Sequence, residues 1–129
     1  MKNLKSVNTT ALAYMGDSVY EVYIRKHVME TGVSDANRLH QMAVNYVKAD
    51  AQAFVIKSIL DDLTPDEQSL VRRARNRKAG TKAKNANIVT YKWATAFEAL
   101  VGFLFLSDNI ERMEEVINKA MEVIDEQSR

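Results

Sequence analysis

The chain of 129 residues has no cysteine, one proline and four glycines. The lack of cysteine excludes disulfide bonds, thiolate nucleophiles and cysteine-ligated zinc, and it is typical of proteins from a reducing compartment. Glycine and proline are scarce and no Asn-Gly or Asp-Gly pair occurs, so the sequence carries no signal for β-hairpins. We therefore predict an all-α fold.

Long apolar runs are also missing. The longest, residues 99–106, is much shorter than the roughly 20 residues that span a bilayer. Residues 1–6 lack the apolar stretch of a signal peptide. With 47% hydrophobic and 27% charged residues, the composition is that of a soluble globular protein. We expect one domain over residues 1–129, located in the cytoplasm.

Apolar residues recur at helical spacing through most of the chain. The strongest start signal is Thr64, which is followed by Pro65 and, in capping-box position, by Glu67. Asn8 and Ser34 are the N-caps predicted for two earlier helices. The predicted helices cover residues 9–30, 35–47, 48–60, 65–77, 90–106 and 110–124.

Acidic residues are absent from residues 68–97, although this segment holds eight of the 18 basic residues. The rest of the chain has ten basic and 17 acidic residues, so the net charge of +1 hides a strong asymmetry. A solvated helix face is the ordinary explanation of a charge run. Here the charges flank a predicted loop over residues 78–87 instead of alternating with acids. This pattern indicates a localised surface that binds a polyanion.

Two acidic residues stand alone in strongly apolar stretches, Asp17 within residues 11–20 and Glu98 within residues 94–105. Ionised side chains are rarely buried unless they are paired or bind a metal, because desolvation is costly. Neither stretch contains a lysine or arginine that could neutralise its acid. Either both carboxylates reach water at a surface, or they share a cation.

Glycine lies close to each of these acids, as Gly16 beside Asp17 and as Gly102 one turn after Glu98. A glycine inside a helix costs about 1 kcal/mol relative to alanine. We therefore expect something to approach the helix closely at both positions. Small neighbours on the same helical face would also leave room for an ion or a phosphate.

The sequence Gly-Asp-Ser-Val at residues 16–19, followed by Phe-Glu-Ala-Leu-Val-Gly from residue 97, resembles the catalytic domain of the ribonuclease III family. The resemblance covers essentially the whole chain and leaves no room for a double-stranded-RNA-binding domain. Ala-Tyr-Met-Gly-Asp at residues 13–17 and the basic tract from Arg73 to residue 86 are most similar to the Mini-ribonuclease III branch.

This resemblance implies a homodimeric helical fold that hydrolyses double-stranded RNA with Mg²⁺, or with Mn²⁺ in its place. Asp17 and Glu98 match the family's catalytic metal ligands, and Tyr14 matches an aromatic residue of the dimer interface. Small members of the family suggest precursor large-subunit ribosomal RNA as the substrate.

The sequence also departs from the family pattern at three positions. Acids of the family motifs are replaced here by Thr10, Ala13 and Thr95. Mg²⁺ takes six oxygen ligands and keeps several waters, so two carboxylates, water and an RNA phosphate can still complete its shell. We expect weak metal binding in the absence of RNA.

Because no separate RNA-binding domain is expected, the basic segment is the predicted contact with RNA. Double-stranded RNA is recognised mainly through its shape, phosphates and 2′-hydroxyls, which suits lysine and arginine. The predicted RNA-binding residues are Arg72, Arg73, Arg75, Arg77, Lys78, Lys82 and Lys84.

Other polar residues have simpler explanations. Glu21 is expected to pair with Arg25 at i,i+4 spacing. His27 and His40 have no second histidine at ligand spacing, so structural roles are expected. Trp93 is expected in the core or the dimer interface, because duplex RNA offers no splayed bases for it to stack on.

Two further classes of function remain open from the residues alone. A catalytically inactive RNA-binding dimer would explain the missing acids. A helical DNA-binding or protein-interaction module would need a recognition helix, which the sequence does not identify.

Overall fold

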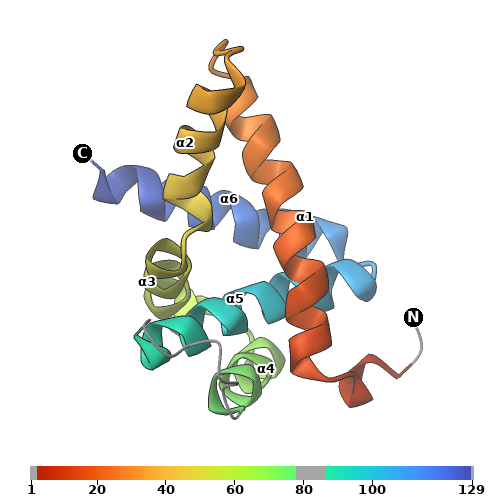
Figure 1. Ribbon diagram of the computed structural model, residues 1–129. Coiled ribbons are helices and arrows are strands. Elements are labelled where there is room, and N and C mark those ends of the chain that lie inside the picture. Colours follow the sequence, from red (N-terminus) through yellow and green to blue (C-terminus); the bar gives the residue numbers. More distant parts are fainter. Residues whose placement is uncertain (1–2, 78–86, 129) are drawn as a thin grey trace.

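The computed structural model describes residues 3–77 and 87–128, which form six α-helices and two short 3₁₀ helices (Figure 1). The 3₁₀ helices are η1 (Leu4–Ser6) and η2 (Leu60–Asp62). The α-helices are α1 (Thr9–Met29), α2 (Ala36–Val47), α3 (Ala49–Ile59), α4 (Pro65–Asn76), α5 (Ile88–Leu106) and α6 (Ile110–Gln127). The described residues contain no strand, which confirms the predicted all-α fold.

The central helix is α5, against which α1, α3, α4 and α6 all pack (Figure 1). A helix that is enclosed by others is apolar on nearly all sides, and Phe97, Leu100 and Val101 are fully buried. By length and composition α5 could also cross a membrane. The apolar run at residues 99–106, which is only part of α5, did not suggest this. Core helices of soluble proteins pass the same test, and 44% of this span is buried against the rest of the protein.

Helices α1 and α5 cross in close contact at Gly16 and Gly102. A Cβ atom added at Gly16 would overlap the carbonyl group of Glu98, and one added at Gly102 would overlap that of Leu12. The prediction of a close approach at the two glycines is thus confirmed. The backbone of the facing helix requires them.

The first turns of α1 and α4 are capped as predicted. The Asn8 Oδ1 atom accepts a hydrogen bond from the Thr10 amide at 2.7 Å. The Glu67 amide donates to Thr64 Oγ1 at 3.2 Å, and the Thr64 amide donates to Glu67 Oε1 at 3.0 Å. These bonds complete the predicted capping box.

The starts of three other helices differ in detail from the prediction. Asp35, not Ser34, caps α2 by accepting from the Arg38 amide at 3.0 Å. Helix α5 begins two residues early, because Asn87 Oδ1 accepts from two amides of its first turn. Asn109 precedes α6 as expected, yet its side chain makes no capping bond. Several adjacent residues could serve as caps in each segment, and the backbone geometry selects one.

Candidate active site

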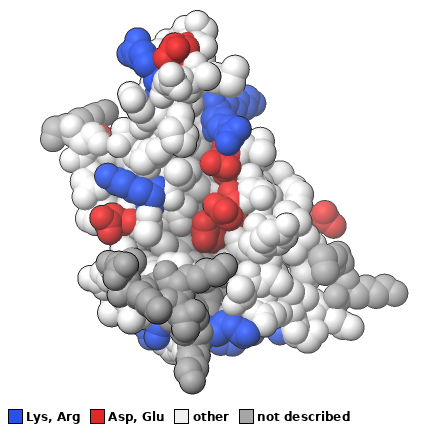
Figure 2. All heavy atoms as spheres, in the orientation of Figure 1, with Lys and Arg blue, Asp and Glu red and all other residues white. Residues whose placement is uncertain are grey.

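The crossing of α1 and α5 brings Asp17 and Glu98 together, although 81 positions separate them in the sequence. Asp17 is exposed and Glu98 is half-buried. Burial, followed by a hydrogen bond and charge repulsion from Asp17, raises the pKa of Glu98 to about 8. Figure 2 shows a column of acidic side chains near the middle of one face, with other acids standing apart from it.

No basic side chain of the described residues forms an ion pair with either carboxylate. The two acids therefore crowd each other without a neutralising partner. Asp17 and Glu98 are also the only two acids that the sequence motifs predict for this site. Within the described ranges, no group of three or more His, Asp or Glu side chains is placed to hold a metal ion.

At three positions the chain has no carboxylate where the family motifs have an acid. The structure shows the surroundings of the residues that stand there. Ala13 is buried in the core and Thr10 is exposed. The Thr95 hydroxyl lies one turn before Glu98 and donates to the carbonyl of Tyr91 at 2.9 Å. The Thr95 side chain therefore makes its hydrogen bond within α5.

Gln52 is a residue near this site that the sequence reasoning missed. Its side chain is 2% exposed, and its Nε2 atom donates to the carbonyl oxygen of Val47 at 3.1 Å. A hydrogen bond from Gln52 also favours the ionised form of Glu98 and thus lowers the pKa of that carboxyl, against the larger effects that raise it. The available signal was a neutral amide among the apolar residues of the predicted helix over 48–60.

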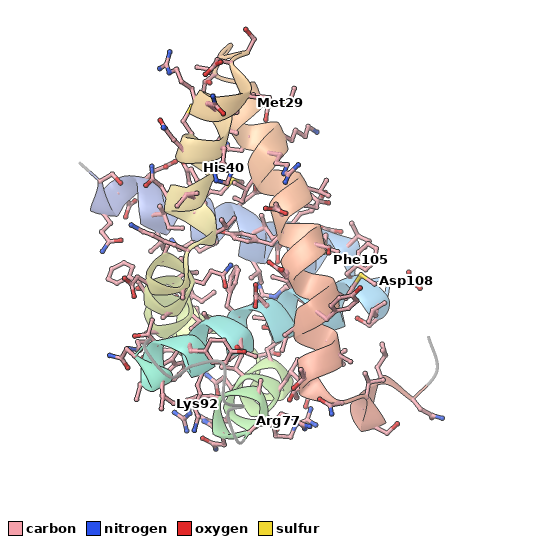
Figure 3. All side chains as sticks on the ribbon, viewed as in Figure 1. Met29, His40, Arg77, Lys92, Phe105 and Asp108 are labelled. Carbon is pink, nitrogen blue, oxygen red and sulfur yellow. The ribbon has the colours of Figure 1, made fainter. Side chains whose placement is uncertain are left out.

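Between α1 and α2 lies a pocket of about 280 Å³, which neither Asp17 nor Glu98 lines. Glu21 and Arg25 line it from α1, and their predicted pair is confirmed with an oxygen–nitrogen distance of 3.6 Å. His40 lines it from α2 and faces α1 (Figure 3). His27 lies elsewhere, packed edge-on against the Tyr46 ring at 5.4 Å, which agrees with a structural role.

Three large apolar side chains are exposed along one side of α1 next to Asp17, with the polar Ser18 and Arg25 exposed between them, and we call this side the apolar stripe. Tyr14, Val22 and Met29 are 79%, 65% and 60% exposed. Their spacing places them on one side of the helix, adjacent to the side that carries Asp17. The core covers the opposite side of α1, so this helix carries large apolar side chains on two sides.

The arginines of α4, together with Arg77 directly after it, divide into two groups. Arg72, Arg73 and Arg77 line an open pocket of about 630 Å³ together with Lys5. Arg75 instead lies over the Trp93 ring, 4.9 Å from its centroid, and Lys57 lies 5.7 Å from the same centroid.

None of the α4 arginines forms an ion pair with a carboxylate of the described residues. Arg77 at the end of α4 and Lys92 on α5 lie at the same edge of the molecule (Figure 3). The predicted RNA-binding residues Lys78, Lys82 and Lys84 lie outside the described residues.

Known proteins share this arrangement of helices. Residues 10–109 match the family model of the ribonuclease III domain. The chain belongs to the ribonuclease III family. This family consists of endoribonucleases that act on double-stranded RNA, and the chain is an endoribonuclease of this type.

Relatives from two bacteria place the chain more narrowly within the ribonuclease III family. It is 44% identical to the Mini-ribonuclease 3 of Enterococcus faecalis, over 98% of this chain and 97% of the relative. It is 41% identical to the Mini-ribonuclease 3 of Streptococcus pneumoniae, over 97% and 99%. The resemblance to the Mini-ribonuclease III branch is therefore confirmed.

A solved structure has the same fold. The crystal structure of protein FN1578 from Fusobacterium nucleatum superposes with a TM-score of 0.84 and is 28% identical in sequence. The match covers 95% of this chain and 98% of that protein.

Proposed function

We propose that this ribonuclease III family member cuts double-stranded RNA at Asp17 and Glu98, with a divalent cation held between the two carboxylates. The observation that carries this proposal is the paired acids without a basic partner, at the helix crossing. We name Mg²⁺ as the cation, with Mn²⁺ able to replace it.

The two acids suit such a cation chemically. Carboxylate oxygens are the ligands that Mg²⁺ prefers, and waters and substrate phosphates commonly complete its shell. The raised pKa of Glu98 reflects burial and the nearby charge of Asp17, both of which a divalent cation would offset. When bound, the cation supplies positive charge that stabilises negative charge on the phosphate and activates a water. Asp17 and Glu98 would orient it from two helices that are locked together at Gly16 and Gly102.

RNA would be held by arginines of α4 and by Arg77 directly after it. Arg72, Arg73 and Arg77 are exposed, and no carboxylate of the described chain competes for them. Lys5 adds a fourth positive charge to their pocket. Phosphate contacts of this kind release counterions and make binding sensitive to salt. Lys78, Lys82 and Lys84 remain proposed contacts, and Arg75 would combine RNA binding with its position over Trp93.

The active form would be a homodimer that buries the apolar stripe of α1. Large apolar side chains that gather on one exposed side of a helix are typical of an interaction surface. Tyr14 would lie in that interface, one helical turn from Asp17. Two acid pairs would then face one duplex.

The substrate would be precursor large-subunit ribosomal RNA in the cytoplasm. The names of the relatives do not state this RNA, and the resemblance to small family members is its support. The general ability to cut double-stranded RNA can be tested first.

The decisive experiment replaces one ligand. Asp17→Asn should leave folding and RNA binding intact and reduce cleavage by about 100-fold or more, since the loss of even a supporting group at a metal site costs 10–100-fold. Cleavage of a labelled duplex RNA is measured with and without Mg²⁺, and binding is measured in the presence of EDTA.

Asp61→Asn is the matched control, because Asp61 is an exposed acid of η2 with no ion pair to another described residue. An Asp17→Asn variant that cuts at the wild-type rate would refute the site. Wild-type protein that binds duplex RNA without cutting it would favour the inactive RNA-binding dimer. Binding of duplex DNA alone would favour the DNA-binding alternative.

A further inference from the structure

Gln52 is a side-chain amide that is buried among apolar residues. It is 2% exposed, and its neighbours on α3 include the buried Val55 and Ile56. Burial of an amide is unfavourable unless its polar atoms are hydrogen-bonded. A core position of this kind calls for leucine or methionine unless the amide has a specific partner.

One partner of Gln52 lies at the corner between α2 and α3. Val47 is the last residue of α2, so its carbonyl oxygen has no acceptor role inside that helix. Gln52 Nε2 donates to this oxygen at 3.1 Å. The bond fixes which end of the carboxamide is the nitrogen, because a carbonyl oxygen can only accept.

The other partner of Gln52 is Glu98. A carboxamide nitrogen has two N–H groups, and only one is used by Val47. The Gln52 side chain, on the helix that packs against α5, also lies within reach of the Glu98 carboxyl and favours its ionised form. Gln52 thus connects a backbone atom at the end of α2 with the half-buried acid on α5, which α3 packs against.

We propose that Gln52 is a positioning residue that orients the Glu98 carboxylate for the divalent cation. The inference rests on the proposed metal site at Asp17 and Glu98. It assigns the support of that site to α3, a helix that contributes neither acid. Groups that hold a metal ligand in place typically change metal affinity or activity by 10–100-fold when they are removed.

The variant that tests this role is Gln52→Met, which keeps the length of the side chain and removes its polar end. We expect a folded protein that needs about tenfold more Mg²⁺ for half-maximal cleavage, with most of the rate recovered at saturating Mg²⁺. Binding of Mn²⁺ to the RNA-free protein, followed by electron paramagnetic resonance, should weaken by a similar factor.

Gln68→Met is the matched control. Gln68 makes the same type of bond, from Nε2 to the carbonyl oxygen of Leu60 at 2.9 Å, and is bonded to neither site acid. Its loss should affect stability but leave the Mg²⁺ requirement unchanged. A merely structural role for Gln52 would make the two variants behave alike.

A second measurement needs no variant. In the wild-type protein, titration with Mg²⁺ should shift the side-chain amide resonances of Gln52 and leave those of Gln68 in place. Wild-type protein that cuts RNA with Mg²⁺, unmoved Gln52 resonances and an unchanged metal requirement in Gln52→Met would overturn this inference alone. Wild-type cleavage that needs no divalent cation would overturn it together with the proposed metal site.

Discussion

At the scale of single residues, the fold clearly disfavours the ionised form of the Glu98 carboxyl. It is half-buried beside a second carboxyl, and its pKa rises from 4.5 to about 8. Gln52 opposes part of this shift but does not cancel it. A group of this kind, in a fold that could have placed an apolar side chain there, is a mark of a functional site.

The pKa of Glu98 predicts how stability depends on pH. The folded protein holds this proton more tightly than the unfolded chain, so metal-free protein should lose stability as the pH rises from about 4.5 through about 8. Glu98→Gln removes the titrating group. We expect the variant to be more stable than wild type at pH 8.5 by about 2 kcal/mol, and the difference to vanish near pH 4.

Urea unfolding in EDTA at several pH values measures this difference. Glu111→Gln is a suitable control, because Glu111 is exposed in the first turn of α6. Parallel stability curves for Glu98→Gln and wild type across this pH range would contradict the shifted pKa.

At the scale of the elements, the junction between α4 and α6 depends on one buried acid. Glu67 is 6% exposed and completes the capping box of α4. Arg112 of α6 donates to both of its carboxylate oxygens, at 2.9 and 2.8 Å. The hydrogen bonds from Arg112, which outweigh the cost of burial, lower the pKa of Glu67.

Removal of Arg112 should therefore be strongly destabilising. Arg112→Met leaves the Glu67 carboxylate buried without its partner, and we expect a loss of about 3 kcal/mol. Urea denaturation at pH 7 measures the loss. Lys119→Met breaks an exposed pair with Glu122, whose nitrogen and oxygen lie 3.3 Å apart, and it should change stability by less than about 1 kcal/mol. Equal effects of the two variants would show that burial of Glu67 does not matter.

At the scale of the whole molecule, the apolar stripe of α1 lies beside the acid pair. Tyr14 is the most exposed of its large side chains, at 79%. Assembly through this stripe would place the acids of two protomers on one surface. Cleavage of a duplex needs two cuts, one in each strand.

Tyr14→Arg should therefore produce a folded monomer with much weaker cleavage, because a charge in an apolar interface remains unpaired. Light scattering after size exclusion measures the mass, and circular dichroism checks the fold. Phe54→Arg, at an exposed position on α3, serves as the control for a surface aromatic residue. A wild-type protein that is monomeric at working concentrations and fully active would contradict the proposal.

Much of this protein follows from the sequence by itself. The helices around Asn8 and Thr64 were predictable because their capping bonds join residues two or three positions apart. The two isolated acids were also visible, since an unpaired carboxylate in an apolar stretch is unusual at the level of the sequence.

Other contacts of single residues were decided only by the tertiary structure, because their partners lie on other helices. Gly16 and Gly102 face the backbone of another helix, Glu67 meets Arg112 at a distance of 45 positions, and Gln52 meets Glu98. Helical periodicity shows which side of a helix is buried but not which helix covers it. Contacts between distant segments depend on how all the helices pack together, and local patterns carry no information about that packing.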